Sequence, residues 1–181
     1  MAKKSKEFAK EIEIPADVEV KIDGNELSLK KAGNENKKRF NKILFEKKEN
    51  KLIVNASGNI RREKKLINTS VAHIKNMLKG LNEKFVYKLQ ICAVHFPMNV
   101  SIKGNEIIIK NFLGEGKDRK ARILEGVDVK ISGEIITIES INKESGGQTA
   151  ANIEKATKVR KKDPRVFQDG IFIIEKAGKA I

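Results

Sequence analysis

The sequence predicts an α+β protein built from two tandem, duplicated domains, each a mostly antiparallel β-sheet covered on one face by an α-helix. Three observations lead to this prediction. Short apolar runs alternate with polar residues in the period of β-strands, and each half of the chain has one longer stretch with helical periodicity. The second half also repeats the pattern of the first over an interval that is longer than a solenoid unit.

The first half begins with charged residues and continues as strands. Residues 1–11 lack an apolar period, so we expect a flexible basic arm. From Ile12 the chain alternates, and the turn at residues 23–25 between two alternating runs predicts a hairpin. The remaining predicted elements of this half are strands at 37–40, 43–45, 52–54 and 85–91, and a helix over 58–79 that Gly80 would cap.

The pattern then starts again. Ile14-Pro15-Ala16-Asp17-Val18 is echoed by Phe96-Pro97-Met98-Asn99-Val100, and Gly24-Asn25-Glu26 by Gly104-Asn105-Glu106. These echoes predict a first repeat over 12–95 and a second over 96–181. The second repeat is expected to contain strands at 100–103, 107–109, 121–123, 127–131 and 135–138, a helix from Gln148, and strands around Val166 and at 171–174.

The charge of the chain indicates a polyanionic partner. Lys and Arg outnumber Asp and Glu by 38 to 24, for a net charge of +14. Such an excess favours nucleic acid or another anionic surface. Glycine-containing loops at 114–120 and 142–147 would let the backbone of the second repeat approach phosphates, so binding is expected to concentrate there.

A glycine-flanked basic helix is the predicted binding element of the second repeat. Gly146 and Gly147 precede a polar first turn, and the unpaired amides of a helix start can hold a phosphate. A row of cations three and four residues apart would share the solvent side of this helix: Lys155, Lys158 and Lys162. Asp163-Pro164 would end the helix. The alternative interpretation is a surface helix whose lysines only keep it soluble.

Groups for catalysis or metal binding are few. The chain has one cysteine, Cys92, and two histidines, His73 and His95, too few for a closed zinc site. We expect Cys92 to be a buried, inert thiol, and we expect no catalytic residues, metal or cofactor. Two alternative hypotheses for the function remain. One is an RNA-processing enzyme with a basic module for structured RNA, and the other is a basic arm that docks on anionic membranes.

The cellular location is inferred from features that the sequence lacks. No apolar run reaches the roughly 20 residues of a membrane span, and no signal-peptide core follows the first lysines. A single cysteine suits a reducing compartment. We therefore expect a cytoplasmic protein that does not enter a membrane.

The aromatic residues narrow the kind of nucleic acid. The chain has no Trp, one Tyr and eight Phe, and most Phe, such as Phe85 and Phe172, fall in strand patterns that predict burial. A protein that stacks single-stranded bases would show more exposed rings. The composition favours folded, double-stranded RNA, read through its backbone and shape.

Three segments together resemble the sixth large-subunit ribosomal protein family. They are Lys88-Leu89-Gln90-Ile91-Cys92 running into His95-Phe96-Pro97-Met98, then residues 147–154, and finally Ala156-Thr157-Lys158 with residues 163–171. The resemblance extends from Ile12 to Glu175. Phe167-Gln168-Asp169-Gly170-Ile171 stands where bacterial members usually have a lysine-and-glycine run, which favours the archaeal and eukaryotic branch.

The resemblance implies a function. It implies a structural, non-catalytic constituent of the large ribosomal subunit with two similar α+β domains. The second domain would be the main contact with large-subunit ribosomal RNA. The binding site would lie near the base of the acidic stalk and the sarcin-ricin loop, close to translational GTPases and neighbouring ribosomal proteins.

In the first repeat, Lys31-Ala32-Gly33-Asn34-Glu35-Asn36 replaces a more glycine-rich turn of the family, which weighs against RNA contact by that loop. The predicted RNA-binding residues of the second repeat come from its glycine-containing loops, its basic row and the positions that match the family. They are Lys117, Arg119, Lys143, Ser145, Gly146, Gly147, Gln148, Thr149, Asn152, Lys155, Lys158, Arg160, Lys161, Lys162 and Arg165.

Overall fold

The computed structural model describes residues 9–48, 51–56, 61–163 and 165–181. The chain divides into two compact units, Met1–Glu83 and Lys84–Ile181, and each is described by itself. No helix in the described parts of the chain is long and apolar enough to cross a membrane.

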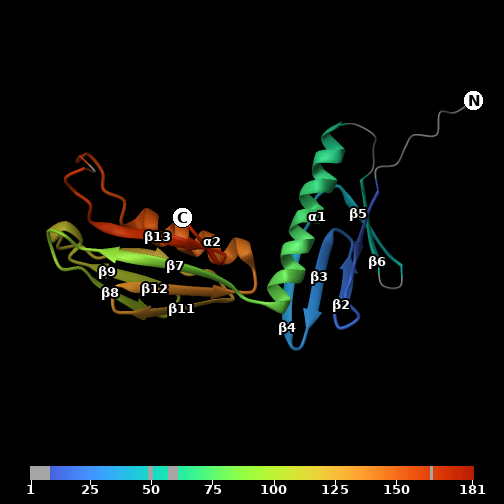
Figure 1. Ribbon diagram of the computed structural model, residues 1–181, viewed down its shortest axis with the longest axis horizontal. Coiled ribbons are helices and arrows are strands. Elements are labelled where there is room, and N and C mark those ends of the chain that lie inside the picture. Colours follow the sequence, from blue (N-terminus) through green and yellow to red (C-terminus); the bar gives the residue numbers. More distant parts are fainter. Residues whose placement is uncertain (1–8, 49–50, 57–60, 164) are drawn as a thin grey trace, which may run out of the picture. The chain divides into compact units, whose positions relative to one another are not determined.

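In its described residues, the first unit forms two three-stranded antiparallel sheets and one helix (Figure 1). One sheet has the strand order β1-β6-β5 and the other β2-β3-β4. The elements are β1 (Lys10–Glu13), β2 (Glu19–Asp23), β3 (Glu26–Lys31), β4 (Asn34–Arg39), β5 (Ile43–Lys48), β6 (Lys51–Ala56) and α1 (Arg61–Asn82). The predicted hairpin is β2-β3, and Gly24 takes the positive φ of 58° that its two-residue turn requires.

Helix α1 packs against strands of both sheets of its unit, namely β1, β3, β4 and β6. Ile67 and Ile74 of the predicted apolar face are fully buried, as are Leu27 and Leu29 of β3. The prediction that Gly80 caps α1 is wrong, because the helix continues to Asn82. Burial of the following Leu81 offsets the roughly 1 kcal/mol by which glycine disfavours a helix.

The second unit repeats this plan and extends it. One sheet has the order β11-β12-β7-β13-β14, the other has the order β10-β9-β8, and every pairing is antiparallel. The strands are β7 (Phe85–Cys92), β8 (Asn99–Lys103), β9 (Glu106–Lys110), β10 (Arg119–Arg122), β11 (Val127–Ser132), β12 (Ile135–Ser140), β13 (Gly170–Lys176) and β14 (Lys179–Ala180). The helices are a short 3₁₀ turn (Phe112–Gly114) and α2 (Lys143–Ala156), which packs on both sheets.

The two units match strand for strand, which confirms the predicted α+β fold of repeated sheet-and-helix units. The order β1-β6-β5 in the first unit corresponds to β7-β12-β11 in the second, and β2-β3-β4 to β8-β9-β10. The echoed sequence Gly104-Asn105-Glu106 forms the β8-β9 turn, where Gly104 has a φ of 60°. The sequence repeat is therefore a repeat of local structure.

The division between the units falls earlier than the expected boundary near residue 95. Strand β7, which the sequence analysis assigned to the first repeat, pairs with β12 and β13 of the second unit. Its side chains Phe85, Tyr87 and Leu89 are buried in the core of that unit. The sequence echoes begin only after this strand, so they mark the second strand of each repeat and not the first.

Three smaller expectations need correction. Residues 1–8 of the expected basic arm lie outside the described residues, but Lys10 and Glu11 already belong to strand β1. No strand forms around Val166, whose amide instead donates to the Asp163 carbonyl in a turn. Strand β14 was not expected, because two residues are too short a stretch to show a pattern.

Candidate nucleic-acid interface

Helix α2 starts before the glycines that were expected to open it. Asn142 is its N-cap, and the Asn142 side-chain oxygen accepts a hydrogen bond from the Glu144 amide at 2.9 Å. The Gly146 amide donates to the Asn142 carbonyl at 3.0 Å, as in any helical turn. The interpretation of Gly146 and Gly147 as a helix start with bare amides for phosphate is therefore wrong.

The two glycines instead let α2 approach strand β7. A Cβ atom on Gly146 would lie 2.8 Å from Tyr87 Cε2 and 3.2 Å from Ser140 Cβ, and one on Gly147 would lie 3.3 Å from the Tyr87 hydroxyl. Tyr87 is held in place because its hydroxyl donates to the Lys143 carbonyl at 2.6 Å. Burial raises the pKa of this phenol above its ordinary value.

Helix α2 also ends before the expected proline stop. Ala150 and Ile153 of the predicted apolar stripe are fully buried, but the helix stops at Ala156, so Lys158 and Lys162 do not continue a helical row. The buried Thr157 ends the helix. Its hydroxyl lies 3.2 Å from the Glu154 carbonyl, to which it donates, and accepts a hydrogen bond from the Ile171 amide at 2.9 Å.

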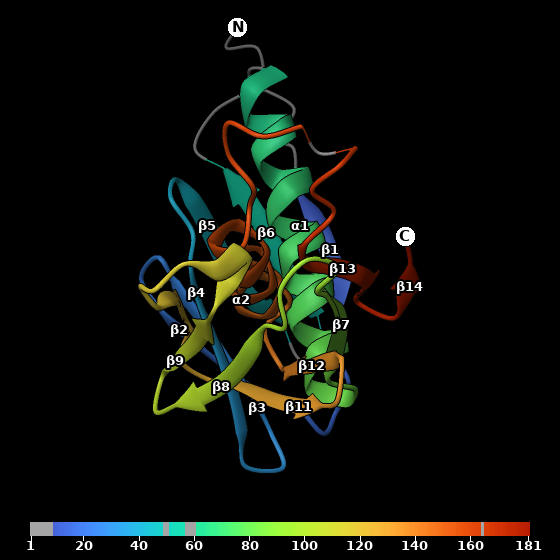
Figure 2. The same cartoon turned by 90° about the vertical axis from the view of Figure 1, so that its left-hand side faces the viewer.

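Residues 158–169, here called the basic segment, leave the unit between α2 and β13 as a projecting loop (Figure 1, Figure 2). Thr157 holds one end and the buried Asp169 holds the other. Asp169 accepts hydrogen bonds from the amides of Val94 and His95 at 2.8 and 2.9 Å, and its second oxygen contacts His95 Nδ1. Burial alone would raise the pKa of Asp169, but these hydrogen bonds outweigh it and lower the pKa.

Further contacts order the inside of the basic segment. The Phe167 ring stacks on His95 with centroids 5.0 Å apart, and Lys162 Nζ lies 4.3 Å from the Phe167 ring centre. The Asp163 carboxylate accepts from the Arg165 amide at 2.9 Å. The partner of His95 is thus Asp169.

The cations of this region are concentrated in a short stretch of the chain. Some sheet lysines pair with carboxylates, as in Lys84–Asp128 at 3.0 Å and Lys88–Glu175 at 2.8 Å, while other sheet lysines, such as Lys130, are exposed singly. Six exposed cations around the basic segment have no carboxylate oxygen within 4.0 Å among the described residues: Lys155, Lys158, Arg160, Lys161, Lys162 and Arg165. Their mutual repulsion is relieved when an anionic partner binds.

The loop at residues 114–120 lies beside the end of α2. Arg119 donates to the Ala156 carbonyl at 2.9 Å and, through two other nitrogens, to both carboxylate oxygens of Glu115 at 2.8 and 2.6 Å. The Arg119 hydrogen bonds, together with the nearby charge of Lys162, lower the pKa of Glu115. The guanidinium of Arg119 is therefore used within the protein, whereas Lys117 is exposed.

The remaining predicted residues are spread along α2. Thr149 is fully buried, and its hydroxyl accepts from the Leu124 amide at 3.3 Å. Asn152 accepts from Gln148 at 2.9 Å and donates to the Arg122 carbonyl at 3.1 Å. Lys143 and Gln148 are exposed and Ser145 is half-buried. Since a helix rises about 1.5 Å per residue, Lys143 lies roughly 20 Å from the end that carries the basic segment.

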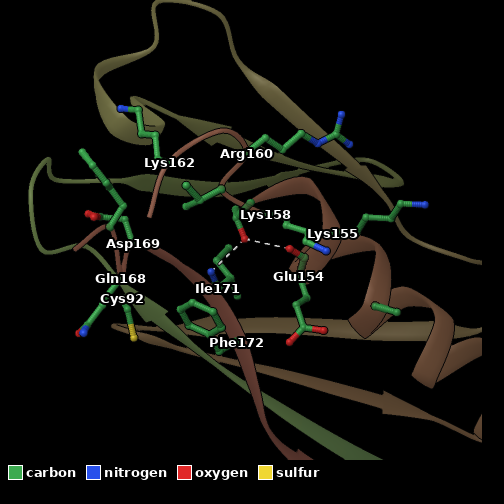
Figure 3. Close-up of a pocket in the computed structure, with 14 residues that line it drawn as sticks. Cys92, Glu154, Lys155, Lys158, Arg160, Lys162, Gln168, Asp169, Ile171 and Phe172 are labelled. Atoms are coloured by element: carbon green, nitrogen blue, oxygen red, sulfur yellow. Dashed lines mark hydrogen bonds between the residues drawn. The ribbon is translucent and has the colours of Figure 1, made fainter. Parts of the chain in front are cut away.

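The second unit contains a cleft that the sequence patterns did not predict. It has a volume of about 1090 Å³ and opens between the end of α2, the basic segment and β13 (Figure 3). Phe172, expected in the core, lines this cleft and is 45% exposed, and Cys92, expected to be buried, is half-buried at its edge. An unbroken run of apolar residues in β13 has no alternation, so it could not show which side chains face the core.

The side chains that could bind a metal are dispersed in the described part of the chain. Within the described residues, no group of three or more His, Cys, Asp or Glu could hold a metal ion. The fold and this surface define the class of protein: a small, basic, duplicated α+β protein with a localised cationic surface on its second unit.

Comparisons with known proteins identify the family. The model of the family described as Ribosomal protein L6 matches residues 96–170. The large ribosomal subunit protein uL6 of Methanococcus vannielii is 46% identical over 173 residues, which cover 94% of this chain and 95% of that protein. The protein of the same name from Methanosarcina mazei is 42% identical over 174 residues, with 95% and 99% coverage.

The chain therefore belongs to the large ribosomal subunit protein uL6 family. This confirms the resemblance found in the sequence, including its archaeal character. Members of the family are structural ribosomal proteins and not enzymes, so the reading as an RNA-processing enzyme is set aside.

Proposed function

We propose that the second unit makes the main contact with ribosomal RNA and that the basic segment is the centre of this contact. Membership of the uL6 family supports the broader assignment of a structural constituent of the large subunit that binds ribosomal RNA in the cytoplasm. The observation that carries the assignment to a surface is the concentration of six exposed cations within residues 155–165, none of them with a carboxylate oxygen within 4.0 Å among the described residues.

The anchoring of the basic segment suits it to phosphate binding. Thr157 and Asp169 hold its two ends, and the contacts of Phe167 order its interior, so little conformational entropy is lost when RNA binds. Exposed lysines and arginines on an ordered loop can contact several phosphates of a folded RNA. Lys143, Gln148 and Lys117 would extend the contact along the unit.

Four of the predicted RNA-binding residues have a structural role in this proposal and do not contact RNA. Gly146 and Thr149 are buried, and Gly147 packs on Tyr87, so these residues position α2 and do not touch RNA directly. Arg119 is held by Glu115 and Ala156 and supports the end of the helix.

The proposed location within the subunit is the base of the acidic stalk, near the sarcin-ricin loop. Translational GTPases and neighbouring ribosomal proteins would then lie close by. The support for this location is the resemblance of residues 147–154 and 163–171 to the family.

A charge-matched pair of variants tests the proposal. The triple variant Lys158→Ala, Arg160→Ala, Lys161→Ala removes three cations of the basic segment. The control Lys30→Ala, Lys37→Ala, Lys51→Ala removes three lysines of the first unit that are paired with Glu35 or Glu11. Both variants lose the same net charge, and exposed pairs contribute only about 0–1 kcal/mol each to stability.

The measurement is affinity for a large-subunit RNA fragment containing the sarcin-ricin region, titrated over several salt concentrations. We expect the basic-segment variant to bind roughly 10- to 100-fold more weakly and to lower the salt slope by roughly 2–3, because fewer counterions are released. The control should change affinity by less than about threefold. Equal losses in both variants would show that only total charge matters, and would remove the basic segment from the proposal.

A further inference from the structure

The cleft of the second unit combines an apolar floor with a cationic rim. Ile171, Phe172 and Val159 contribute apolar surface, and the rim carries Lys155, Lys158, Arg160 and Lys162. In Figure 3, Phe172 lies below Ile171, while the side chains of Lys155, Arg160 and Lys162 extend outward from the cleft. An RNA duplex that is contacted only through its phosphates would bind the cations of the rim. It would make no contact with the apolar floor.

Phe172 is the aromatic ring that can receive a ligand. Its ring packs against the bare backbone of Gly170, where an added Cβ would come within 3.0 Å of Phe172 Cζ. The other ring of the cleft, Phe167, is already stacked on His95 and covered by Lys162. One positioned ring with exposed surface therefore lies among four cations.

A carboxylate beside the floor adds an acceptor. The Glu154 side chain extends to the same side of the cleft as Phe172 (Figure 3), and one of its oxygens accepts from the Ile173 amide at 3.4 Å. A carboxylate can also accept hydrogen bonds from the amino groups of a nucleobase. The cleft thus offers a stacking surface, an acceptor for a base edge and cations for phosphates.

We propose that this cleft receives a single unpaired nucleotide of the ribosomal RNA, an inference that rests on the proposed function of the second unit. The base packs on Phe172, and the adjoining phosphates lie on Lys158 and Arg160. Sequence-specific RNA recognition commonly uses splayed bases stacked on aromatic rings, with the backbone held by basic side chains. Because Phe172 is the one uncovered ring among the described residues of the cleft, the site suits one extruded nucleotide within a folded RNA and not a single-stranded tract.

The charge of the rim distinguishes this occupant from an apolar protein segment. The four rim cations face two acidic side chains in the cleft, Glu154 and Asp169, and Asp169 is buried in its contacts with residues 94 and 95. An apolar peptide would gain nothing from the cations, whereas a nucleotide uses both the rim and the floor.

The test compares two RNA hairpins of the sarcin-ricin region, one fully paired and one with a single bulged adenosine. The full-length protein should prefer the bulged RNA by at least about fivefold, since a base stacked on an aromatic side chain contributes that much or more. Phe172→Leu keeps an apolar side chain but removes the ring, and should abolish the preference while leaving the salt slope unchanged. Phe96→Leu is the control, because Phe96 is 48% exposed and does not line the cleft.

A second readout uses assembled large subunits. Phe172 is replaced by the photoreactive analogue p-benzoylphenylalanine, and the crosslinked partner is identified. A crosslink to one ribosomal RNA nucleotide is expected. A crosslink to a neighbouring protein would overturn the proposal and make that protein the occupant.

The two proposals fail in different ways. Equal binding of paired and bulged RNA with a steep salt dependence would overturn the nucleotide site and leave the proposed RNA-binding function standing. Absence of binding to both RNAs would overturn the proposed function, and the nucleotide site with it.

Discussion

The two units share one plan but differ in the chain beyond the helix. In the first unit α1 is the last element before Lys84, whereas in the second α2 leads into the basic segment and then into β13, which pairs with β7. Some lysines of the first unit, such as Lys31 beside Asp17 at 2.6 Å, pair with carboxylates, whereas the basic segment adds a run of exposed cations with no carboxylate oxygen within 4.0 Å among the described residues. The repeat therefore supplies a frame, and the segment after α2 supplies the candidate site.

Close packing of the helix is a second difference. Helix α1 meets its sheets through large side chains such as Ile67 and Ile74, whereas α2 meets β7 partly through Gly146 and Gly147. Because these two glycines have no side chains, α2 packs close to β7, and the end of α2 with its cations lies beside β13. The second unit thus differs from the first in three features that mutations can change: where its chain begins, the glycine contact of α2 with β7, and the Thr157 anchor.

The largest expected effect concerns the boundary. A fragment of residues 84–181 should unfold cooperatively in urea, because it keeps β7 at the centre of the five-stranded sheet. A fragment of residues 96–181 loses Phe85, Tyr87 and Leu89 from the core together with both ladders of β7. It should show no cooperative transition by circular dichroism. A stable 96–181 fragment would restore the boundary that the sequence echoes suggested.

Overpacking at the helix contact should have the next largest effect. Gly146→Val would place a side chain against the fixed Tyr87 ring, and we expect the free energy of unfolding to fall by about 3 kcal/mol. Helix propensity contributes little, since glycine and valine differ by only a few tenths of a kcal/mol.

Gly116→Val is the matched control for this change. No heavy atom lies within 4 Å of the Cβ that Gly116 would gain, so stability should change by less than about 0.5 kcal/mol. Urea unfolding of both variants provides the comparison. Similar stabilities would show that α2 can move away from β7 at little cost.

The smallest expected effect concerns the anchor of the basic segment. Thr157→Val keeps the shape but leaves the buried Ile171 amide without its acceptor, which should cost about 1–2 kcal/mol of unfolding free energy. Thr69→Val in α1 is the counterpart in the first unit, because the exposed Thr69 hydroxyl only bonds to the Lys65 carbonyl of its own helix. We expect that control to change stability by less than about 0.5 kcal/mol. If both variants lost the same unfolding free energy, the hydrogen bond from the Ile171 amide to Thr157 would not be an anchor of the basic segment.

Local patterns explain why much of the fold could be predicted. Alternation around Val18, Val20 and Leu27 identified a hairpin because a strand turns successive side chains to opposite faces. The turn at Gly24 was recognisable because glycine adopts a positive φ without steric cost. The cations of the candidate site were also predictable, since a charged side chain without a buried partner stays exposed.

Distant contacts explain why other features could not be predicted. Gly146 and Gly147 resemble a helix boundary locally, but Tyr87, far away in the sequence, makes them interior positions of α2. Lys158 follows a helical pattern, but the hydrogen bond between Thr157 and Ile171 ends the helix first. The exposure of Phe172 depends on which face of β13 meets the core, and only pairing with β7 decides that.

Periodicity, turn residues and composition, which are read over short stretches of chain, were enough to predict the repeated α+β plan and the concentration of positive charge in the second half. The resemblance of three segments added the family. The start of the second unit, the presentation of its cations and the cleft with an exposed ring beside them became visible only in the folded chain. The physical reason is that packing and hydrogen bonds between residues distant in the chain set helix ends and strand faces, and override local propensity.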